Sequence, residues 1–429
     1  MNYQPIKRFF ILFISSLAIL TTAQSCTGLN LGISNPLVAP TILGVLKHDP
    51  EIKSDGFGQI NSVKTVSGGK DVQGLSNLSG NKISQVNKDT LFLLTKTKGL
   101  FKSTNGGRDW ERKYIFNINS NEFDQNKKNQ EITAKINQND SFVPSDFIID
   151  TQNEQNIFVA GKTNDKIGKI YSSNDGGDTF KLTYTEVQVD IGVNIITIDP
   201  ANPLRVYALL EGGSLIRSLD AGSTWKKVQN FKETPVQVGF TQGIKPTLFV
   251  ILRTVGVSIS LNDGDSWETI NTEKEPITEK SETKTEGASF ISSNPKKNIF
   301  TLFDRFIPVS TPNGAIESAI MVADNQLWYS ENISKLPFKK LLLPLQADQQ
   351  NILDVAIDRA KGLDRIYVSV GNKLLETKNK GESWNSQDKI GLSSKIGNIG
   401  QILLDKDNSE TIYLMLIDPK LKRTNGRFE

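Results

Sequence analysis

The octapeptide Ser218-Leu219-Asp220-Ala221-Gly222-Ser223-Thr224-Trp225 is one of several similar segments in this chain. Each copy has Ser or Thr first, Asp or Asn third, Gly fifth and an aromatic residue eighth. Self-similarity of this kind is the sequence signature of a repeat architecture. The fixed residues of the five full copies are Ser103, Asn105, Gly107, Trp110; Ser173, Asp175, Gly177, Phe180; Ser218, Asp220, Gly222, Trp225; Ser260, Asn262, Gly264, Trp267; and Thr377, Asn379, Gly381, Trp384.

The spacing of the copies defines the repeat. A weaker copy runs from Ser330 to Phe338 without the Gly, and Arg423–Gly426 resembles a truncated one. The aromatic ends, with Phe338 included, lie 70, 45, 42, 71 and 46 residues apart. A period of about 44 residues with two insertions of about 26 accounts for these intervals.

Each period contains four short segments with the composition of β-strands. In the third period these are 194–198, 205–210, 214–218 and 224–228, separated by Asp-Pro, Gly-Gly and Asp-x-Gly turns. A four-stranded unit of about 40–45 residues, repeated, is typical of a β-propeller. We therefore predict an all-β fold, a single seven-bladed β-propeller, with six or eight blades left open. The last unit ends after its second strand, so we expect residues 56–66 to supply the missing outer strand.

The boxes themselves have a mechanical interpretation. We expect each box to join the third and fourth strands of a blade, with the Asp or Asn side chain accepting hydrogen bonds from its own turn. The Gly supplies a positive φ, the Ser hydroxyl caps the turn, and the aromatic ring packs between blades. These roles are structural, and neither catalysis nor calcium binding is expected of the box carboxylates.

On these residues the chain resembles the Asp-box, or BNR-repeat, propellers over about residues 55–429. That family includes sialidases, the Vps10 domain of sortilin, xyloglucan-cleaving glycosidases and photosystem II assembly factors. The resemblance implies that the boxes lie away from the ligand face. The sialidase pattern is not matched, because the nearest string to its Arg-Ile-Pro is Arg305-Phe306-Ile307-Pro308, late in the chain.

Composition narrows the function classes. With 50 basic and 47 acidic residues, the chain offers no strong field for nucleic acid. One Cys and one His exclude a disulfide framework and a zinc site built on several such ligands. No cofactor, metal or catalytic residue is implied.

The first residues predict export. Lys7-Arg8 precede the apolar run Phe9–Leu20, which has the length of a signal-peptide core. The following segment ends at Cys26 and resembles the lipobox of bacterial lipoproteins, in which that Cys is acylated, although Ala23 replaces the usual Leu. We expect a signal peptide at 1–25, a lipidated tether at 26–54, a propeller at 55–429, and attachment to a bacterial membrane on its periplasmic or outer side. An ordinary secretory signal or an uncleaved anchor are the alternatives.

The expected ligand face is the one that carries the loops between second and third strands and the blade connections. We expect all the long segments to lie there, because long loops on a rigid scaffold often carry binding residues. They are Asn117–Val143, Gly161–Gly168, Asn271–Gly287 and Asp304–Ile320. Its basic residues favour an anionic or glycan partner, unless Lys serves only to solvate this surface. They are Lys96, Lys98, Lys162, Lys166, Arg253, Arg305 and Lys373.

The leading hypothesis is therefore a non-enzymatic, monomeric lipoprotein that binds a protein or polymer on this long-loop face. The alternative is a carbohydrate-active enzyme of glycosidase or sialidase type, with two carboxylates about 5–9.5 Å apart on the same face.

Overall fold

The chain divides into two compact units, Met1–Pro40 and Thr41–Glu429, and the described residues belong to the second. The structure is a computed structural model. It shows an all-β fold, as predicted, arranged as a β-propeller. The structure describes residues 45–48, 58–60, 62–63, 80–95, 99–107, 109–113, 115, 142–270, 300–333, 338–346, 351–358, 360–386, 397–421, 423–424 and 427–428.

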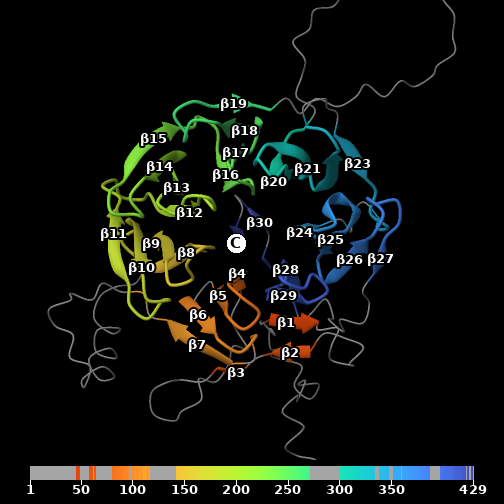
Figure 1. The fold of residues 1–429 in the computed structure, drawn as a ribbon, viewed down its shortest axis with the longest axis horizontal. Coiled ribbons are helices and arrows are strands. Elements are labelled where there is room, and N and C mark those ends of the chain that lie inside the picture. Colours follow the sequence, from red (N-terminus) through yellow and green to blue (C-terminus); the bar gives the residue numbers. More distant parts are fainter. Residues whose placement is uncertain are drawn as a thin grey trace, which may run out of the picture. The chain divides into compact units, whose positions relative to one another are not determined.

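Six blades are antiparallel sheets of four strands that follow one another in the chain (Figure 1). Valine, isoleucine, leucine and aromatic residues predominate in the second strands, which are buried along most of their length. Blade 1 is β4 (Gly80–Gln85), β5 (Leu91–Thr95), β6 (Gly99–Ser103) and β7 (Asp109–Lys113); blade 2 is β8 (Val143–Ile149), β9 (Ile157–Lys162), β10 (Gly168–Ser173) and β11 (Lys181–Thr185); blade 3 is β12 (Val193–Ile198), β13 (Val206–Leu210), β14 (Ser214–Ser218) and β15 (Lys226–Asn230).

The remaining three blades have shorter outer strands. Blade 6 also contains a 3-10 turn at Gly362–Asp364. Blade 4 is β16 (Pro235–Phe240), β17 (Leu248–Leu252), β18 (Gly256–Ser260) and β19 (Glu268–Thr269); blade 5 is β20 (Phe303–Ser310), β21 (Ile316–Ala323), β22 (Gln326–Ser330) and β23 (Lys339–Leu341); blade 6 is β24 (Ile352–Ile357), β25 (Ile366–Val370), β26 (Lys373–Thr377) and β27 (Asn385–Ser386).

The predicted count of seven blades is corrected to six blades of consecutive strands, completed by one composite sheet. This closing sheet pairs β28 (Asn398–Leu404) and β29 (Ile412–Ile417) with β1 (Val45–His48) and β2 (Gly58–Ile60). The seventh repeat stops after its second strand, so the chain before blade 1 supplies the rest.

The closing sheet also moves one predicted boundary. The strand β2 lies inside the expected range 56–66, but β1 belongs to the segment assigned to the tether. A further strand, β3 (Ser62–Val63), pairs parallel with the outer strand β7 of blade 1. The predicted truncated box near the end instead forms the separate hairpin of β30 (Arg423–Thr424) and β31 (Arg427–Phe428).

Apolar clusters hold the sheets together in a ring. The first strands β4, β8, β12, β16, β20, β24 and β28 lie nearest the centre, and the fourth strands lie at the rim (Figure 1). Each neighbouring pair of sheets shares one buried cluster, including that between blade 1 and the closing sheet, which contains Val45 and Tyr413. Burial of apolar area between sheets is thus the main force that closes the ring.

Polar side chains on the first strands add a second set of links, here called the polar belt. The carboxylate of Asp354 (β24), which is 1% exposed, accepts hydrogen bonds from Arg305 (β20) and, at 2.7 Å, from the backbone N–H of Ile402 (β28). Similar links join Asp146 to Lys82 (2.7 Å) and Ile196 (3.0 Å), Gln237 to Phe306 (3.0 Å twice), and Gln401 to Ile83 (2.8 and 3.0 Å).

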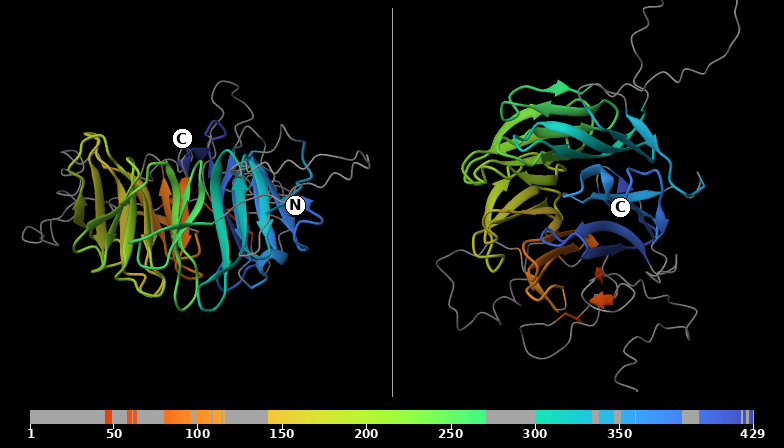
Figure 2. Two further views of the ribbon diagram at one scale, coloured as in Figure 1. Left: turned by 90° about the horizontal axis from the view of Figure 1, so that it is seen from above. Right: turned by 45° about the vertical axis from the view of Figure 1, so that its right-hand side comes forward.

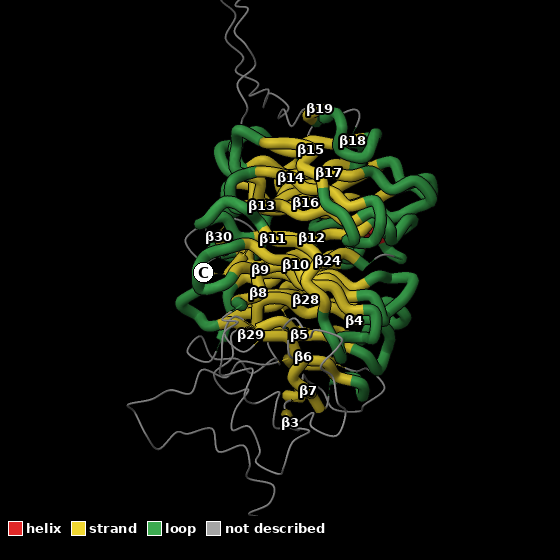
Figure 3. Tube along the Cα trace, turned by 90° about the vertical axis from the view of Figure 1, so that its left-hand side faces the viewer, coloured by secondary structure: helices red, strands yellow, loops and turns green. Residues whose placement is uncertain are grey.

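Strand order gives the ring two faces (Figures 2 and 3). The turns between first and second strands share the box face with the boxes, as shown by the bond from Gly176 N–H to the Gln155 carbonyl (3.0 Å). The opposite, long-loop face carries the other connections. The predicted long loop Asp304–Ile320 is corrected, because this segment forms most of the β20–β21 hairpin and its turn lies on the box face. There the Gly314 carbonyl accepts the hydroxyls of Thr241 (2.6 Å) and Thr247 (3.1 Å).

Candidate functional site

The five boxes form one repeated hydrogen-bonded turn. In the third box, the Ser218 hydroxyl donates to Asp220 (2.7 Å) and accepts the Gly222 N–H (2.7 Å), while Asp220 accepts the N–H (2.8 Å) and hydroxyl (2.5 Å) of Thr224. The Gly has the expected positive φ of +83°, and the preceding Ala221 also has a positive φ, of +53°. The Ser218 and Asp220 side chains therefore make their hydrogen bonds within the turn.

The second box repeats these contacts with Asp175, and the fourth and fifth repeat them with Asn in place of Asp. Asn262 accepts the Ser266 N–H (2.9 Å) and donates to the Ser266 hydroxyl (2.8 Å), so the charge is dispensable for the turn. In the third box, hydrogen bonds from Thr224 and Ser218 lower the pKa of Asp220 to about 2. A carboxylate held this firmly as the anion is unsuited to proton transfer near neutral pH.

The five predicted basic residues that the structure describes lie on or near the long-loop face, and four of them are in ion pairs. Lys162 contacts Glu211 (2.9 Å), Lys166 contacts Asp190 (2.9 Å) and Arg253 contacts Asp304 (3.8 Å). Arg305 belongs to the polar belt, and Lys373 is exposed at the start of β26. Lys96, Lys98, Cys26, the segment 271–287 and almost all of 117–143 lie outside the described residues.

A different feature of this face was missed by sequence reasoning. The connection from β11 to β12, residues 186–192 and here called the valine loop, exposes Val187 at 93% and Val189 at 68% of their surface. Two apolar side chains turned to solvent on one short loop have no role in the core. The signal in the sequence was the alternation Val187-Gln188-Val189-Asp190, in which apolar residues fall outside any repeat strand.

Hydrogen bonds fix the valine loop at both ends. The carboxylate of Glu186 accepts the N–H groups of Val187 (2.9 Å) and Gln188 (3.0 Å) and the hydroxyl of Tyr184 (2.7 Å). Burial would raise the pKa of Glu186, but the hydrogen bonds from Tyr184 and the two N–H groups lower it below its ordinary value. Glu186 is thus an anchoring anion for the loop.

The far end of the loop is held by charges. Gly192 N–H donates to Glu211 (2.9 Å), which also pairs with Lys162, and Asp190 pairs with Lys166. Asp190 and Lys166 both have positive φ, +66° and +61°, a conformation that costs energy in residues with a side chain. The valines therefore project from a fixed loop beside paired charges.

Six of the carboxylates described on this face are each engaged by a neighbouring group. Such contacts favour structural roles over acid–base catalysis, for which a general acid needs a raised pKa. The pairs are Glu186 with Tyr184, Asp190 with Lys166, Glu211 with Lys162, Glu233 with Thr254, Asp304 with Arg253, and Asp324 with Thr301.

In the described part of the chain, no group of three or more His, Cys, Asp or Glu side chains is placed to hold a metal ion. No helix in these ranges has the length and apolarity needed to cross a membrane.

Comparison with known proteins gives a likeness of fold. No family model matches the sequence, and no curated protein matches it. Among solved structures, YCF48 bound to a D1 peptide is 13% identical with a TM-score of 0.51, covering 80% of this chain and 93% of that one. YCF48 from Cyanidioschyzon merolae is 14% identical with a TM-score of 0.53, covering 80% and 94%.

Glycosidases of the GH74 type share the fold as well. The Niastella koreensis GH74 enzyme is 14% identical with a TM-score of 0.53, and the match covers 80% of this chain but 51% of that one. This chain therefore spans about half the length of that enzyme. At such identities the comparisons show the β-propeller fold alone. Any argument about activity must therefore come from the residues of the site.

Proposed function

We propose that this protein is a non-enzymatic binding protein that holds a protein partner on its long-loop face, with the valine loop as the central contact. The observation that carries the proposal is the exposure of Val187 and Val189 on a loop fixed by Glu186 and Glu211. Contiguous apolar surface rimmed by polar groups is typical of protein interaction sites, and we propose that the two neighbouring valines form the centre of one.

The physical argument rests on desolvation and preorganisation. Burying one exposed valine side chain contributes about 1.5 kcal/mol or more. Because hydrogen bonds and ion pairs already hold the loop, little conformational entropy is lost when a partner covers it. The paired charges Lys162–Glu211 and Lys166–Asp190 form the polar rim.

One of the solved structures gives this proposal context. YCF48, 93% of whose chain is covered by the match, has been solved with a D1 peptide. A propeller of this size can therefore hold a polypeptide segment, and we propose the same class of ligand here.

The alternative activity is glycoside hydrolysis. It would need an acid and a second carboxylate facing each other. The lowered pKa of Glu186 and the engaged partners of Asp190 and Glu211 argue for binding instead. Release of reducing ends from xyloglucan by the purified protein, lost on substitution of carboxylates on this face, would favour the enzyme.

The test uses a photo-cross-linking amino acid placed at Gln188 in the full-length protein, expressed in its source cells. We expect one protein adduct, abolished when Val187 and Val189 are both changed to Asp. The matched control carries Ile244→Asp and Leu261→Asp, which are 73% and 81% exposed on the box face. Equal adduct yield with both double variants would contradict the proposal.

Membrane attachment through Cys26 is a separate proposal from the sequence. Acylation there would place the propeller at the surface of a bacterial membrane. Labelling with a fatty-acid precursor should be lost in Cys26→Ser, and equal labelling of wild type and variant would contradict the anchor.

A further inference from the structure

A cavity of about 960 Å³ lies on the box face between blades 2 and 3. One wall is formed by β10, the second box and β11, and the other by the turn and box of blade 3. Its volume is at the upper end of the range of about 300–1,000 Å³ usual for ligand sites. The lining residues used below are Asp150, Asn156, Phe158, Ser172, Ala221 and Ser223.

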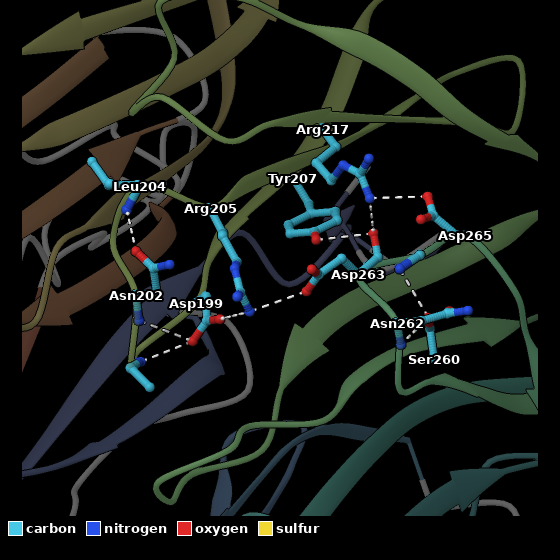
Figure 4. Close-up of polar contacts among 12 residues, drawn as sticks. Asp199, Asn202, Leu204, Arg205, Tyr207, Arg217, Ser260, Asn262, Asp263 and Asp265 are labelled. Atoms are coloured by element: carbon cyan, nitrogen blue, oxygen red, sulfur yellow. Dashed lines mark hydrogen bonds and ion pairs between the residues drawn. The ribbon is translucent and has the colours of Figure 1, made fainter.

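The corresponding gap between blades 3 and 4 is filled by this chain's own side chains (Figure 4). Arg217 donates to the carbonyl of Asp263 (2.7 Å) and contacts the Asp265 carboxylate (3.0 Å). Tyr207 donates to the same Asp263 carbonyl (3.0 Å). Arg205 links Asp199 of its own turn (3.3 Å) to the Asp263 carboxylate (3.0 Å).

Blade 1 fills its gap in the same way. Lys102, which directly precedes the box Ser103 as Arg217 precedes Ser218, donates to the carbonyl of Gly176 (3.1 Å). Gly176 and Asp263 occupy the same fourth position of their boxes. In both blades, a cationic side chain donates a hydrogen bond to the carbonyl of the fourth box residue in the next blade.

Blade 2 has shorter or less polar residues at all three positions. Ser172 stands in the place of Arg217, Phe158 in the place of Tyr207 and Asn156 in the place of Arg205, since Phe158 pairs with Ser172 across the sheet as Tyr207 pairs with Arg217. Ala221, at the fourth position of the third box, lines the cavity between blades 2 and 3.

One buried carboxylate in this cavity is held by neutral groups. Asp150, 3% exposed, accepts the Gln152 N–H (2.8 Å) and the Asn156 side-chain amide (3.2 Å). The corresponding Asp199 and Asp358 contact guanidinium groups, those of Arg205 and Arg365. The blade 2 cavity therefore has a buried carboxylate held by neutral groups, where the corresponding carboxylates of blades 3 and 6 contact a guanidinium.

We infer that this cavity binds a cationic side chain, guanidinium or ammonium, of a partner polypeptide in an extended conformation. The cavity is larger than one such side chain, so flanking residues of the partner have room. The neighbouring strand β11 is the outermost strand of its sheet among the described residues, and the corresponding outer strand of blade 1, β7, pairs with the added strand β3. A strand added there would direct alternate side chains toward blade 3.

The test is binding of the acetylated, amidated tripeptide Gly-Arg-Gly to the full-length protein, followed by NMR shifts of the Ala221 and Ser223 amides. The neutral control peptide has citrulline in place of Arg. We expect saturable shifts with the Arg peptide and at least tenfold weaker binding of the citrulline peptide.

Two protein variants complete the test. Ser172→Arg places a guanidinium in the gap as Arg217 does in blade 3, so we expect an equal or higher melting temperature and loss of peptide binding. Thr185→Arg adds the same charge on β11 outside the lining residues and should bind the peptide as wild type does. Equal binding of both peptides, binding retained in Ser172→Arg, or no shift at tens of millimolar peptide would overturn the inference.

Discussion

At the scale of single residues, each box combines an acceptor at its third position with a positive φ at its fourth and fifth. The acceptor may be charged or neutral, because Asp220 and Asn262 make the same turn. The sequence pattern predicted the Gly but not the strained residue before it, since any residue type occupies that position: Ala221, Asp263 and Lys380 all have positive φ. The boxes were thus predictable because their chemistry is local.

The pH dependence that Asp220 gives to folding stability should be confined to acidic pH. Its folded-state pKa of about 2 lies below the ordinary 3.8, so its contribution to stability is present above about pH 4 and is lost as the pH falls through 2. We expect Asp220→Asn to melt within a few degrees of wild type at pH 7. Between pH 4 and 2 the variant should lose less stability than wild type, as followed by thermal unfolding. Parallel pH profiles of the two proteins would refute this assignment.

Gly222 should tolerate no side chain. Its φ is +83°, and an added Cβ would lie 2.7 Å from the Phe158 ring. We expect Gly222→Ala to cost about 1–3 kcal/mol in urea unfolding. Gly362→Ala is the control, because Gly362 also has a positive φ (+58°) but no atom within 4 Å of an added Cβ. Equal losses in the two variants would show that the contact with Phe158 contributes nothing.

At the scale of elements, the first strands are linked by polar side chains that the repeat pattern did not predict. The polar belt uses residues of four types at the same place in the sheet, namely Lys82, Asp146, Gln237, Arg305 and Asp354. Sequence reasoning assigned Lys and Arg residues to a ligand surface because burial and pairing across blades are not visible in one strand. The valine loop was not predicted either, because the exposure of Val187 and Val189 is not visible from the sequence of one strand.

The polar belt gives a direct comparison of buried and exposed ion pairs. Asp354→Asn leaves Arg305 facing a neutral partner and should cost roughly 3 kcal/mol in urea unfolding. Asp190→Asn removes the ion pair with Lys166, whose two side chains are 65% and 66% exposed, and should cost about 0–1 kcal/mol. A loss for Asp354→Asn no larger than that for Asp190→Asn would mean that the belt does not hold the ring together.

At the scale of the whole molecule, closure depends on a strand that carries no repeat signature. Val45 lies in β1, is 0% exposed, and packs with Tyr413 and Met415. The four residues of β1 are too few to show periodicity, so the sequence placed them in a tether. The closing strand β2 was foreseeable only because the count of strands left the last unit incomplete.

Disrupting closure should unfold the ring as a unit. Val45→Asp buries an unpaired charge and should cost about 4 kcal/mol or more in urea unfolding. Val187→Asp, at an exposed position, should change stability by about 0.5 kcal/mol at most. Similar unfolding curves for the two variants would contradict the role of β1.

The central claim, that the valine loop binds a protein, is tested most directly by affinity. The measurement is the Kd of the partner captured at Gln188, for wild type and for two double variants. Val187→Asp with Val189→Asp should weaken binding about 100-fold, which corresponds to about 2.8 kcal/mol. Ile244→Asp with Leu261→Asp on the box face should leave Kd within about twofold. A Kd unchanged in the valine variant, or weakened equally in both, would contradict the account.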